Sequence, residues 1–407
     1  MNWKVSRAFT TIGSGTTPKS DDTSYYEDGT INWLITGDVN DGEIKNIDRK
    51  ITAKALSDYS ALHIYPVGSI VITMYGAIGK IGMLTEPSTV NQACCVLVPG
   101  KNVFPKYALH YFLATRHQLI ELGVGGVQSN VSQDIIKSLR ISLPSVEMQR
   151  NIASYLDRKV SIIDKIIAAK NHTHTHLLGL RQAIITDAVL GRGSVGVDYR
   201  QTNIPWIGKI PAHWQVRRIK DIADISVGWT PDTNNPDYFN GNNTWVTIAD
   251  MNQKYIVSSK VKISNEAIDS SRIRLVKKGS LLYSFKLSVG KVAFAGKDLY
   301  TNEAIAAITP NYNNEVDTSF LYYAISTYLA NNANENIYGA KIMNQDTIRN
   351  SYIAFPDINE QLKISRTLDK KVRNIDNAVS INKQSIQLLN EYRSSLISNV
   401  INGKVKV

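Results

Sequence analysis

Apolar residues recur every three or four positions along two long stretches of the chain, residues 145–190 and 357–402. The stripe of the first stretch consists of Ile152, Leu156, Val160, Ile163, Ile167, Leu177, Ile184 and Ala188. The stripe of the second consists of Ile364, Leu368, Val372, Ile375, Val379, Ile386, Leu389, Leu396 and Val400. A narrow stripe with this spacing is typical of a coiled coil, because it places the apolar side chains on one seam. The pattern therefore predicts two long helices that pack together.

Polar residues and helix-ending residues occupy equivalent places in the two stretches. Polar residues interrupt the two stripes, at Lys170 and Arg181 and at Asn382 and Arg393. Proline precedes each stretch and glycine follows it, at Pro144 and Gly191 and at Pro356 and Gly403. Polar seam residues specify register, and proline and glycine mark the two ends of a helix. We expect the helices to pack antiparallel; the alternative is that each covers its own globular domain.

The second half of the chain repeats the first. From Gln133 onward, adding 212 to a residue number gives its counterpart without a gap. Earlier segments match with one-residue gaps: Gly29, Trp33, Asp38 and Asn40 with Gly241, Trp245, Asp250 and Asn252, GSIVITMYGAIGKIG (68–82) with GSLLYSFKLSVGKVA (279–293), and VNQA (90–93) with TNEA (301–304). A period of this length indicates two copies of one structural unit.

Each copy begins with a part that reads as a mixed globular domain. Runs typical of strands occur at Ser69–Met74, Ala93–Val98, Ser280–Phe285 and Ala304–Ile308, and short helices are expected near Lys106–Leu122 and Thr318–Asn331. The predicted fold is α+β: two mixed α/β domains separated by an antiparallel pair of long coiled-coil helices, in a pseudo-twofold tandem repeat. The predicted segments are a first domain (1–143), a central helix and linker (144–199), a second domain (200–355) and a C-terminal helix (356–407).

Composition narrows the class of protein. The chain has 407 residues, with 46 Lys and Arg against 35 Asp and Glu, so its formal charge of +11 favours a polyanionic partner. No apolar run reaches the roughly 18 residues that span a bilayer, and no secretory signal is visible. The two cysteines, Cys94 and Cys95, are adjacent, which excludes a disulfide framework and a cysteine-based zinc site. We expect a cytoplasmic protein.

Two short motifs are similar to catalytic sites but lack essential parts. NPDY (235–238) is similar to the loop with which amino-methyltransferases hold a flipped adenine, but Asp237 stands where proline belongs and no glycine-rich cofactor loop precedes it. We interpret it as a turn, because Asn-Pro favours turns. The acids of PDINEQLK (356–363) suit the first turn of a helix better than a nuclease metal site.

Two further groups have the residue types of metal or redox sites. His172 and His176 share a helix face with i and i+4 spacing, but no acid or cysteine nearby completes a metal site. Cys94 and Cys95 align with apolar strand residues, so they are expected to be buried and reduced. We therefore expect no catalytic residue, no metal and no cofactor in this chain.

One segment and its counterparts carry a family resemblance. IPWIGKIPAHW (204–214) precedes Gly228, Thr230, Pro231 and Trp245, and the first half repeats the pattern with Trp3, Gly15, Thr17, Pro18 and Trp33. The pairs Gly79–Lys80 and Gly290–Lys291 and the helix segments LDRKV (156–160) and LDKKV (368–372) belong to the same pattern. Over essentially its whole length, the chain resembles the DNA-specificity subunit of type I restriction–modification systems.

The resemblance implies a function. Each globular part is expected to be a target recognition domain that reads one half of a bipartite, asymmetric site in double-stranded DNA. The helices are expected to set the half-site spacing and to bind two methyltransferase subunits, which restriction and motor subunits join. S-adenosylmethionine, and ATP with magnesium, are expected in those partners, and this chain is expected to be non-catalytic. A coiled-coil adaptor with protein-binding domains is the alternative.

Basic and aromatic residues supply candidates for DNA contact. In the second domain, residues 272–297 contain seven basic residues and no acid, with Tyr283 and Phe285 between them. We interpret this run as one face that follows DNA phosphates, which an adaptor would not need; a solvated surface is the alternative. The DNA-binding candidates of this domain are Arg272, Arg274, Lys277, Lys278, Lys286, Lys291 and Lys341. Those of the first domain are Lys19, Tyr25, Tyr26, Tyr75, Lys80, Gln128 and Asn130.

Overall fold

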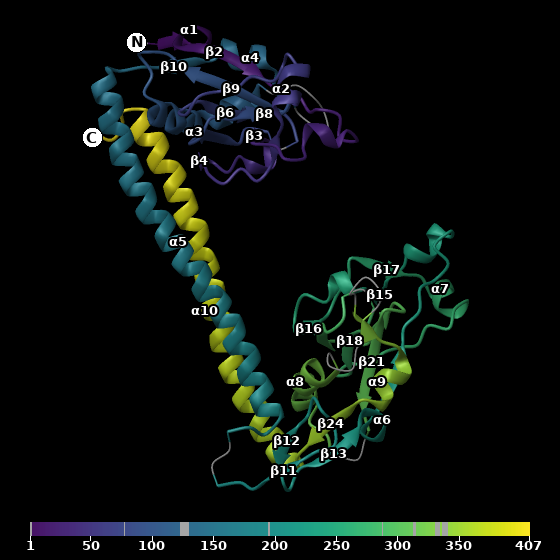
Figure 1. The fold of residues 1–407 in the computed structure, drawn as a ribbon. Coiled ribbons are helices and arrows are strands. Elements are labelled where there is room, and N and C mark those ends of the chain that lie inside the picture. The colour runs from purple at the N-terminus through teal and green to yellow at the C-terminus, as the bar shows by residue number, and fades with distance from the viewer. Residues whose placement is uncertain are drawn as a thin grey trace. The chain divides into compact units, whose positions relative to one another are not determined.

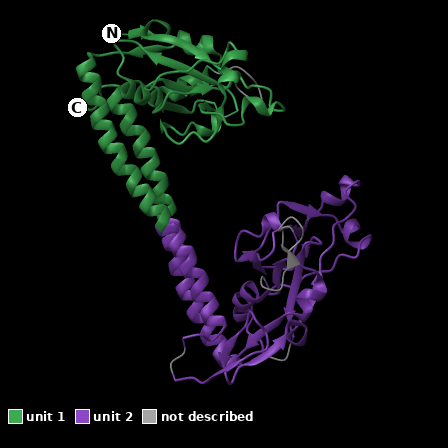
Figure 2. Cartoon of the chain, viewed as in Figure 1, with its two compact units in different colours: residues 1–172, 382–407 green, residues 173–381 purple. Residues whose placement is uncertain are grey.

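The computed structural model describes residues 2–76, 78–122, 130–193, 196–286, 288–311, 315–329, 334–335 and 341–407 (Figure 1). The chain divides into two compact units, which Figure 2 shows in different colours. Unit 1 comprises Met1–His172 and Asn382–Val407, and unit 2 comprises Thr173–Ile381. Each unit therefore combines one globular part with a stretch from each of the two long helices.

The two long helices confirm the apolar pattern. Helix α5 is Val146–Val189 and helix α10 is Ile358–Ile401, each 44 residues long and within one residue of the predicted ranges. The glycines that follow them, Gly191 and Gly403, have positive φ values of 67° and 71°. Beyond each glycine, the next N–H donates five residues back into the helix, which satisfies carbonyls that the helix leaves unpaired.

Within each unit the two helices run antiparallel. In unit 1, Arg393 of α10 pairs with Asp164 of α5 at 2.8 Å, and the Asn382 side chain donates to the Lys170 carbonyl at 2.8 Å. In unit 2, Arg181 pairs with Asp376 at 2.8 Å. The two ion pairs join counterpart residues of the repeat. The polar interruptions predicted to specify register therefore form the polar contacts between the helices.

Each globular part contains a five-stranded sheet with the same strand order. In unit 1 the order is β2 (Phe9–Ser14), β9 (Cys94–Pro99), β6 (Ile70–Thr73), β7 (Ile81–Leu84) and β4 (Gly42–Ile44). In unit 2 it is β14 (Ala223–Val227), β21 (Ile305–Pro310), β18 (Leu281–Ser284), β19 (Val292–Ala295) and β16 (Tyr255–Ile256). Neighbouring strands are antiparallel except for the last pair of each sheet. The predicted strand runs are confirmed.

Of the smaller sheets, the three-stranded sheet and one two-stranded sheet occur in both units. Three-stranded sheets have the orders β5 (Lys50–Ile51), β3 (Ile31–Leu34), β8 (Thr89–Val90) and β17 (Val261–Ile263), β15 (Asn243–Val246), β20 (Tyr300–Thr301). Two-stranded sheets pair β1 (Asn2–Lys4) with β10 (Arg140–Ser142), β13 (Gln215–Arg218) with β24 (Tyr352–Phe355), β11 (Tyr199–Gln201) with β12 (Lys209–Pro211) and β22 (Asn334–Glu335) with β23 (Lys341–Ile342). The β11–β12 and β22–β23 sheets are described in unit 2 alone.

Short helices complete the globular parts. Unit 1 has α1 (Val5–Ala8), α2 (Ala53–Asp58), α3 (Pro105–Glu121) and α4 (Gln133–Ser138), with 3₁₀ turns at Thr23–Tyr25 and Thr36–Asp38. Unit 2 has α6 (Ile219–Ile222), α7 (Asn265–Asp269), α8 (Thr318–Tyr328) and α9 (Gln345–Asn350), with 3₁₀ turns at Pro236–Phe239 and Ile248–Asp250. Helices α3 and α8 occur where the apolar spacing predicts them.

Strand register corrects one part of the predicted repeat. Trp3 pairs with Ile141 in the β1–β10 sheet, and Arg217 pairs with Ile353 in the β13–β24 sheet. Because Ile141 and Ile353 are counterparts, Trp3 occupies the position of Arg217 and is not the counterpart of Trp214. Trp214 is itself 2% exposed, and its indole N–H donates to Glu360 near the start of α10 at 3.0 Å.

The central strands are apolar throughout because both faces of the sheet are covered. In β6, Ile70 and Ile72 point into a core shared with α3, α5 and α10, while Val71 points into a second core on the opposite face. Unit 2 divides β18 in the same way, with Leu281 on one face and Leu282 on the other. Successive side chains of these strands thus alternate between two buried cores, and not between a core and solvent.

A buried glutamine fixes each globular part to its long helix. Gln149 of α5 is fully buried, and its amide accepts from the Phe104 N–H at 2.8 Å and donates to the carbonyls of Asn102 and Pro144, both at 2.9 Å. Its counterpart Gln361 makes the same kind of contacts, accepting from the Asp317 N–H and donating to two carbonyls. Because each buried amide has its donors and its acceptor paired in this way, it specifies one orientation of the helix start on its globular part.

Candidate nucleic-acid interface

In unit 1, several loops meet at one end of the five-stranded sheet. The end of β2 pairs with the start of β9 at Ser14 and Cys95, and the end of β6 pairs with it at Thr73 and Cys94. The segments that continue from these strands therefore lie together. We call this the loop end of unit 1; it comprises Gly15–Pro18, residues 75–76 and 78–80, Asn91–Ala93, and Asn130.

Backbone and side-chain bonds join these segments. The Met74 N–H donates to the Ala93 carbonyl at 2.8 Å, and the Val131 N–H donates to the Met74 carbonyl at 3.0 Å. The Thr17 hydroxyl donates to Gln92 Oε1 at 2.7 Å. Asn130 is exposed and is held beside Tyr75 through the Val131 contact. The loop end is thus a set of short loops fixed by the sheet beneath them.

Unit 2 has the same loop end, built from Gly228–Pro231, residues 285–286 and 288–291, Asn302–Ala304 and Met343. The Phe285 N–H donates to the Ala304 carbonyl at 3.0 Å, and the Met343 N–H donates to the Phe285 carbonyl at 3.2 Å. The Thr230 hydroxyl donates to Glu303, the counterpart of the bond from Thr17 to Gln92.

Glycine is required where each Gly-x-Thr-Pro loop leaves the sheet. A Cβ at Gly15 would lie 1.6 Å from the Val90 carbonyl oxygen, and one at Gly228 would lie 2.1 Å from the Thr301 oxygen. The residue after each glycine accepts a bond from a buried tryptophan: Trp33 donates to the Thr16 carbonyl at 3.2 Å, and Trp245 donates to the Trp229 carbonyl at 3.1 Å. The two loops therefore have nearly fixed backbones.

The structure brings three candidates of the first domain to its loop end. Tyr75 is 37% exposed, and partial burial raises the pKa of its phenol. Lys80 directly precedes β7, and its N–H donates to the Thr73 hydroxyl at 3.0 Å. Asn130 lies beside Tyr75, as described above. Gln128 lies outside the described residues.

Lys19, Tyr25 and Tyr26 lie in the smaller lobe, around the three-stranded sheet. The Tyr26 hydroxyl donates to the Pro18 carbonyl at 2.6 Å, and its ring packs edge-on against Trp33. The Tyr25 hydroxyl donates to Asp58 at 3.2 Å. Desolvation and the Asp58 carboxylate raise the pKa of Tyr25. Both phenols have intramolecular partners, whereas the Lys19 side chain is exposed just after the Gly-x-Thr-Pro loop.

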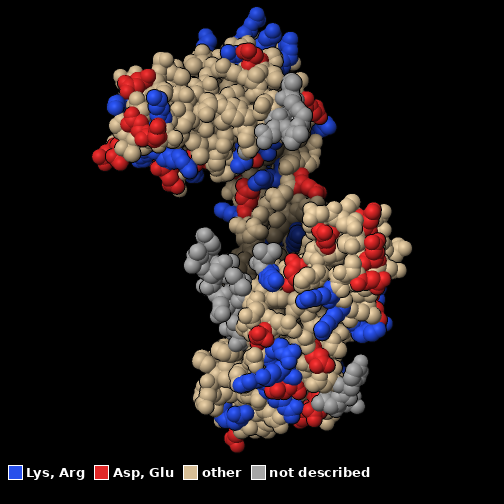
Figure 3. Space-filling view, turned by 90° about the vertical axis from the view of Figure 1, so that its right-hand side faces the viewer, with Lys and Arg blue, Asp and Glu red and all other residues tan. Residues whose placement is uncertain are grey.

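The interpretation of residues 272–297 as one basic face is wrong. Lys286 and Lys291 lie at the loop end of unit 2, after β18 and before β19. Arg272, Arg274, Lys277 and Lys278 precede β18 and therefore lie at the opposite end of the sheet. Lys277 also pairs with Asp298 at 3.0 Å, just beyond the acid-free run. On the face drawn in Figure 3, acidic side chains lie among the basic ones over both units.

The aromatic residues of this run do not contribute to a surface. Tyr283 is fully buried and Phe285 is 2% exposed, both within the core between the sheet and the helices. Burial raises the pKa of Tyr283 well above its ordinary value. Lys291 directs its ammonium to the Ile248 carbonyl at 3.1 Å, and Lys286 is exposed. Lys341 begins β23, two residues before Met343.

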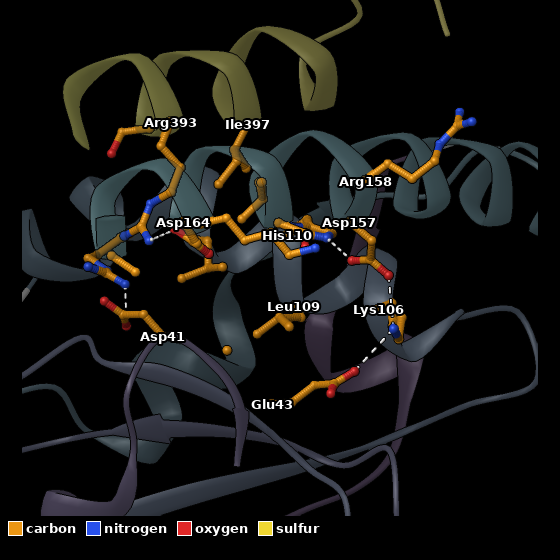
Figure 4. Close-up of a pocket in the computed structure, with 18 of the residues that line it drawn as sticks. Asp41, Glu43, Lys106, Leu109, His110, Asp157, Arg158, Asp164, Arg393 and Ile397 are labelled. Carbon is orange, nitrogen blue, oxygen red and sulfur yellow. Dashed lines mark hydrogen bonds and ion pairs between the residues drawn. The ribbon is translucent and has the colours of Figure 1, made fainter. Parts of the chain in front are cut away.

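Unit 1 also has a cleft of about 930 Å³ between its globular part and the two helices (Figure 4). Each acid that lines it has a basic partner. Asp157 of α5 accepts from His110 at 2.8 Å and from Lys106 at 2.9 Å, and Lys106 also contacts Glu43 at 3.1 Å. Asp41 pairs with Arg116 at 2.5 Å, and Asp164 with Arg393 at 2.8 Å. The paired acids make the cleft a structural joint.

The joint aspartate has a shifted pKa in both units. Burial alone would raise the pKa of Asp157, but the hydrogen bonds from His110 and Lys106 outweigh it and hold the pKa below its ordinary value. Its counterpart Asp369 accepts from Lys254 and from the Tyr323 hydroxyl, both at 2.6 Å. Its pKa is lowered for the same reasons. One aspartate thus joins each globular part to its helix through different donors.

The motifs that were not assigned a catalytic role have structural contacts. The Asn235 side chain accepts from the Asp237 N–H at 3.1 Å, so NPDY forms a 3₁₀ turn as predicted. Asp357 caps α10 by accepting from the Glu360 N–H at 3.0 Å. Cys94 and Cys95 are buried, as predicted, and burial raises the pKa of each thiol to about 12.

Neither a metal-binding cluster nor a membrane-spanning helix occurs in the part of the chain that the structure describes. Among the described residues, no group of three or more His, Cys, Asp and Glu side chains could hold a metal ion. In that same part of the chain, no helix is long and apolar enough to cross a membrane. The observations define a class of protein in which two copies of one α/β fold, each with a matching loop end, are joined by paired long helices.

The comparisons with known proteins identify the family. The model of the type I restriction modification DNA specificity domain matches residues 3–173 and 211–391, one copy in each half. The chain belongs to this family. A solved chain from a structure on complex assembly and conformational transition of the type I R-M system has the same fold, with a TM-score of 0.76 and 15% identity. That similarity covers 100% of this chain and 98% of the other.

Relatives from bacteria and archaea cover the chain to different extents. The StySPI specificity subunit of Salmonella potsdam is 20% identical, covering 98% of this chain and 88% of that protein. The MjaIX specificity subunit of Methanocaldococcus jannaschii is 29% identical, but only 50% of this chain and 46% of that protein are covered. The HsdS subunit of Thermoanaerobacter tengcongensis has a TM-score of 0.54 at 15% identity over 100% of this chain and 97% of the other.

Proposed function

We propose that this chain is the DNA-specificity subunit of a cytoplasmic type I restriction–modification complex, in which each globular part reads one half of a bipartite, asymmetric site. The observation that carries this proposal is the pair of loop ends. They share their frame, with Gly15 and Gly228 at counterpart positions, but differ at positions that are exposed or, for Thr16, half-buried. The differing pairs are Thr16 and Trp229, Tyr75 and Lys286, and Gln92 and Glu303. One scaffold with two sets of loop side chains suits the reading of two different half-sites.

The same loop ends supply chemistry suited to duplex DNA. Lys80 and Lys291 occupy counterpart positions directly before a strand, and lysine contacts to phosphate give salt-dependent affinity. Asn130 and Gln92 carry amides, the groups that bind adenine edges in the major groove. Arg272, Arg274, Lys277 and Lys278 lie at the other end of the sheet and remain candidates for phosphate contact only. Lys19 lies beside the loop end of unit 1 and is a further phosphate candidate.

Exposed apolar residues on the long helices support the binding of partner subunits. Ile162, Ile166, Leu388 and Tyr392 in unit 1, and Leu178 and Leu180 in unit 2, are between 41% and 64% exposed. A narrow seam leaves these residues outside the helix pair, and exposed apolar groups of this kind mark protein-binding surfaces. We propose that methyltransferase subunits bind there and supply S-adenosylmethionine, while restriction and motor subunits supply ATP and magnesium chemistry. The chain itself is then non-catalytic.

A methylome tests the function. The chain is co-expressed with the methyltransferase encoded beside it, and methylated adenines are mapped at single-base resolution. The expected result is one bipartite motif with a fixed gap, because two recognition domains on one frame contact two half-sites at a constant separation. Omission of this chain is the control and should remove the motif.

A second result distinguishes the alternative. If the complex assembles and methylates DNA but no motif depends on this chain, the specificity role is wrong and the coiled-coil adaptor becomes the better account. If no complex assembles, purification of this chain with the methyltransferase over a salt series shows which subunit contact fails.

A further inference from the structure

Trp229 is an exposed tryptophan on a loop whose backbone is fixed. Its side chain is 45% exposed, although large aromatic residues usually bury most of their surface. It stands between Gly228 and Thr230 at the loop end of unit 2. The internal repeat does not single it out, because the residue after the glycine is the one position of Gly-x-Thr-Pro that differs between the two copies.

Contacts on both sides of Trp229 hold it in place. Its N–H donates to the Thr301 carbonyl at 2.9 Å, and its carbonyl accepts from the Trp245 indole at 3.1 Å. Gly228 lies against the Thr301 backbone with no room for a Cβ, and the Thr230 hydroxyl donates to Glu303. The backbone that carries the exposed indole is therefore fixed, and little backbone entropy remains to be lost when the indole binds a partner.

The surroundings of Trp229 indicate what it binds. The loop end of unit 2 also contains Lys286, which is exposed, and Lys291. An aromatic ring on the same loop surface as lysines is the combination with which proteins pack on bases and sugars while neutralising phosphates. The counterpart in unit 1 is Thr16, whose carbonyl accepts the corresponding tryptophan bond. Unit 1 therefore has the same loop without the ring.

We propose that Trp229 is a DNA-contacting residue of unit 2, whose indole packs on the bases or sugars of one half-site of the duplex. The inference deepens the proposed function and rests on it. It makes the two half-sites unequal: the Gly-x-Thr-Pro loop of unit 2 contributes an indole, and the corresponding loop of unit 1 contributes no ring. Apolar side chains that enter a groove act through the shape and deformability of a base step, so the contact contributes to sequence preference.

The test uses the full chain in complex with its methyltransferase and a fluorescent duplex carrying the mapped bipartite motif. Trp229→Ala is expected to weaken binding by at least roughly five-fold, the lower end of the range measured for removal of an aromatic ring that stacks on single-stranded bases. Trp229→Phe is expected to recover part of the affinity. The matched control is Leu275→Ala, an apolar residue that is 44% exposed at the opposite end of the sheet, and it should bind normally.

Two further measurements separate a DNA contact from a structural role. Trp229→Ala should leave the salt dependence of binding unchanged because the indole neutralises no phosphate, whereas Lys286→Ala should reduce the slope by about one. The change in the protein's tryptophan fluorescence when an unlabelled duplex is added should be smaller for Trp229→Phe than for the wild type. A duplex with only the unit 2 half-site scrambled should bind wild type and Trp229→Ala equally.

The outcomes separate this inference from the proposed function. Wild-type binding that does not distinguish the motif from a scrambled duplex contradicts the specificity role itself. Motif-specific wild-type binding with unchanged affinity and fluorescence in the Trp229 variants overturns only the indole contact. If Trp229→Ala also lowers the melting temperature, the difference in tryptophan fluorescence response between wild type and Trp229→Phe decides, because a ring that does not contact DNA would contribute none of the response.

Discussion

At the scale of single residues, Asp157 and Asp369 join each globular part to the first turns of its long helix. Asp157 accepts from a histidine and a lysine, and Asp369 accepts from a lysine and a tyrosine. The acceptor is the same in both copies, while the donors differ with the domain. A constant acceptor on the helix can therefore serve domains of different sequence, provided that each supplies suitable donors.

The joint predicts a pH dependence. Asp157→Asn should destabilise unit 1 by about 1–2 kcal/mol at pH 7, because hydrogen bonds to a charged group are strong but this side chain is partly exposed. The folded pKa of Asp157 is lowered, so its contribution is fully present above the unfolded value near 3.9 and is lost as pH falls through the folded value. The difference between wild type and variant in calorimetric unfolding should therefore shrink below about pH 4.

A matched control accompanies this measurement. Asp134→Asn removes a carboxylate that is 93% exposed and 3.7 Å from Lys137, and it should change unfolding little at any pH. A difference for Asp157→Asn that grows as the pH falls would contradict the assignment, because it would require the charged carboxylate to destabilise the fold.

At the scale of elements, the long helices have two kinds of apolar surface. The seam residues, such as Leu156 and Leu368, are buried within the units. Others, including Leu388 and Tyr392, are 64% and 58% exposed although they lie on the same helix as buried neighbours. The seam accounts for the stability of the helix pair, and the exposed residues are available for another subunit.

Charged residues introduced on the exposed apolar face of α10 should impair binding of the methyltransferase without destabilising the fold. Leu388→Glu combined with Tyr392→Glu is expected to change the free energy of unfolding by less than about 0.5 kcal/mol, as surface changes usually do. The same double variant should lose most of its copurification with the methyltransferase, because binding would bury two unpaired charges. Gln384→Glu, at an exposed polar position of the same helix, is the control. Normal copurification of the double variant would show that the methyltransferase binds elsewhere.

At the scale of the whole molecule, the repeat makes the globular parts separable modules. Gln149 and Gln361 contact the preceding globular part through backbone N–H and carbonyl groups. Because backbone groups are present whatever the side chains, these contacts tolerate a domain of different sequence. The same fold with different loop ends is then sufficient for two different half-sites.

Exchange of one module tests this organisation. Residues 1–143 are replaced by the matching part of the StySPI specificity subunit, and the methylome is mapped again. One half of the motif should change, while the other half and the gap should stay, because unit 2 and both helices are untouched. If the exchanged chain still methylates the parental motif with both halves unchanged, residues 1–143 do not read DNA. A change in both halves would contradict modular reading.

The sequence by itself determined the helices, the repeat and most central strands, because these depend on spacing between residues close in the chain and on similarity at a constant offset of 212. Only the tertiary structure showed that Tyr283 is buried, that Trp229 is exposed, and that Arg272 and Lys286 lie at opposite ends of β18. It also replaced Trp214 by Arg217 as the counterpart of Trp3. Burial and register are set by pairing between strands far apart in the chain, and no local pattern contains that information.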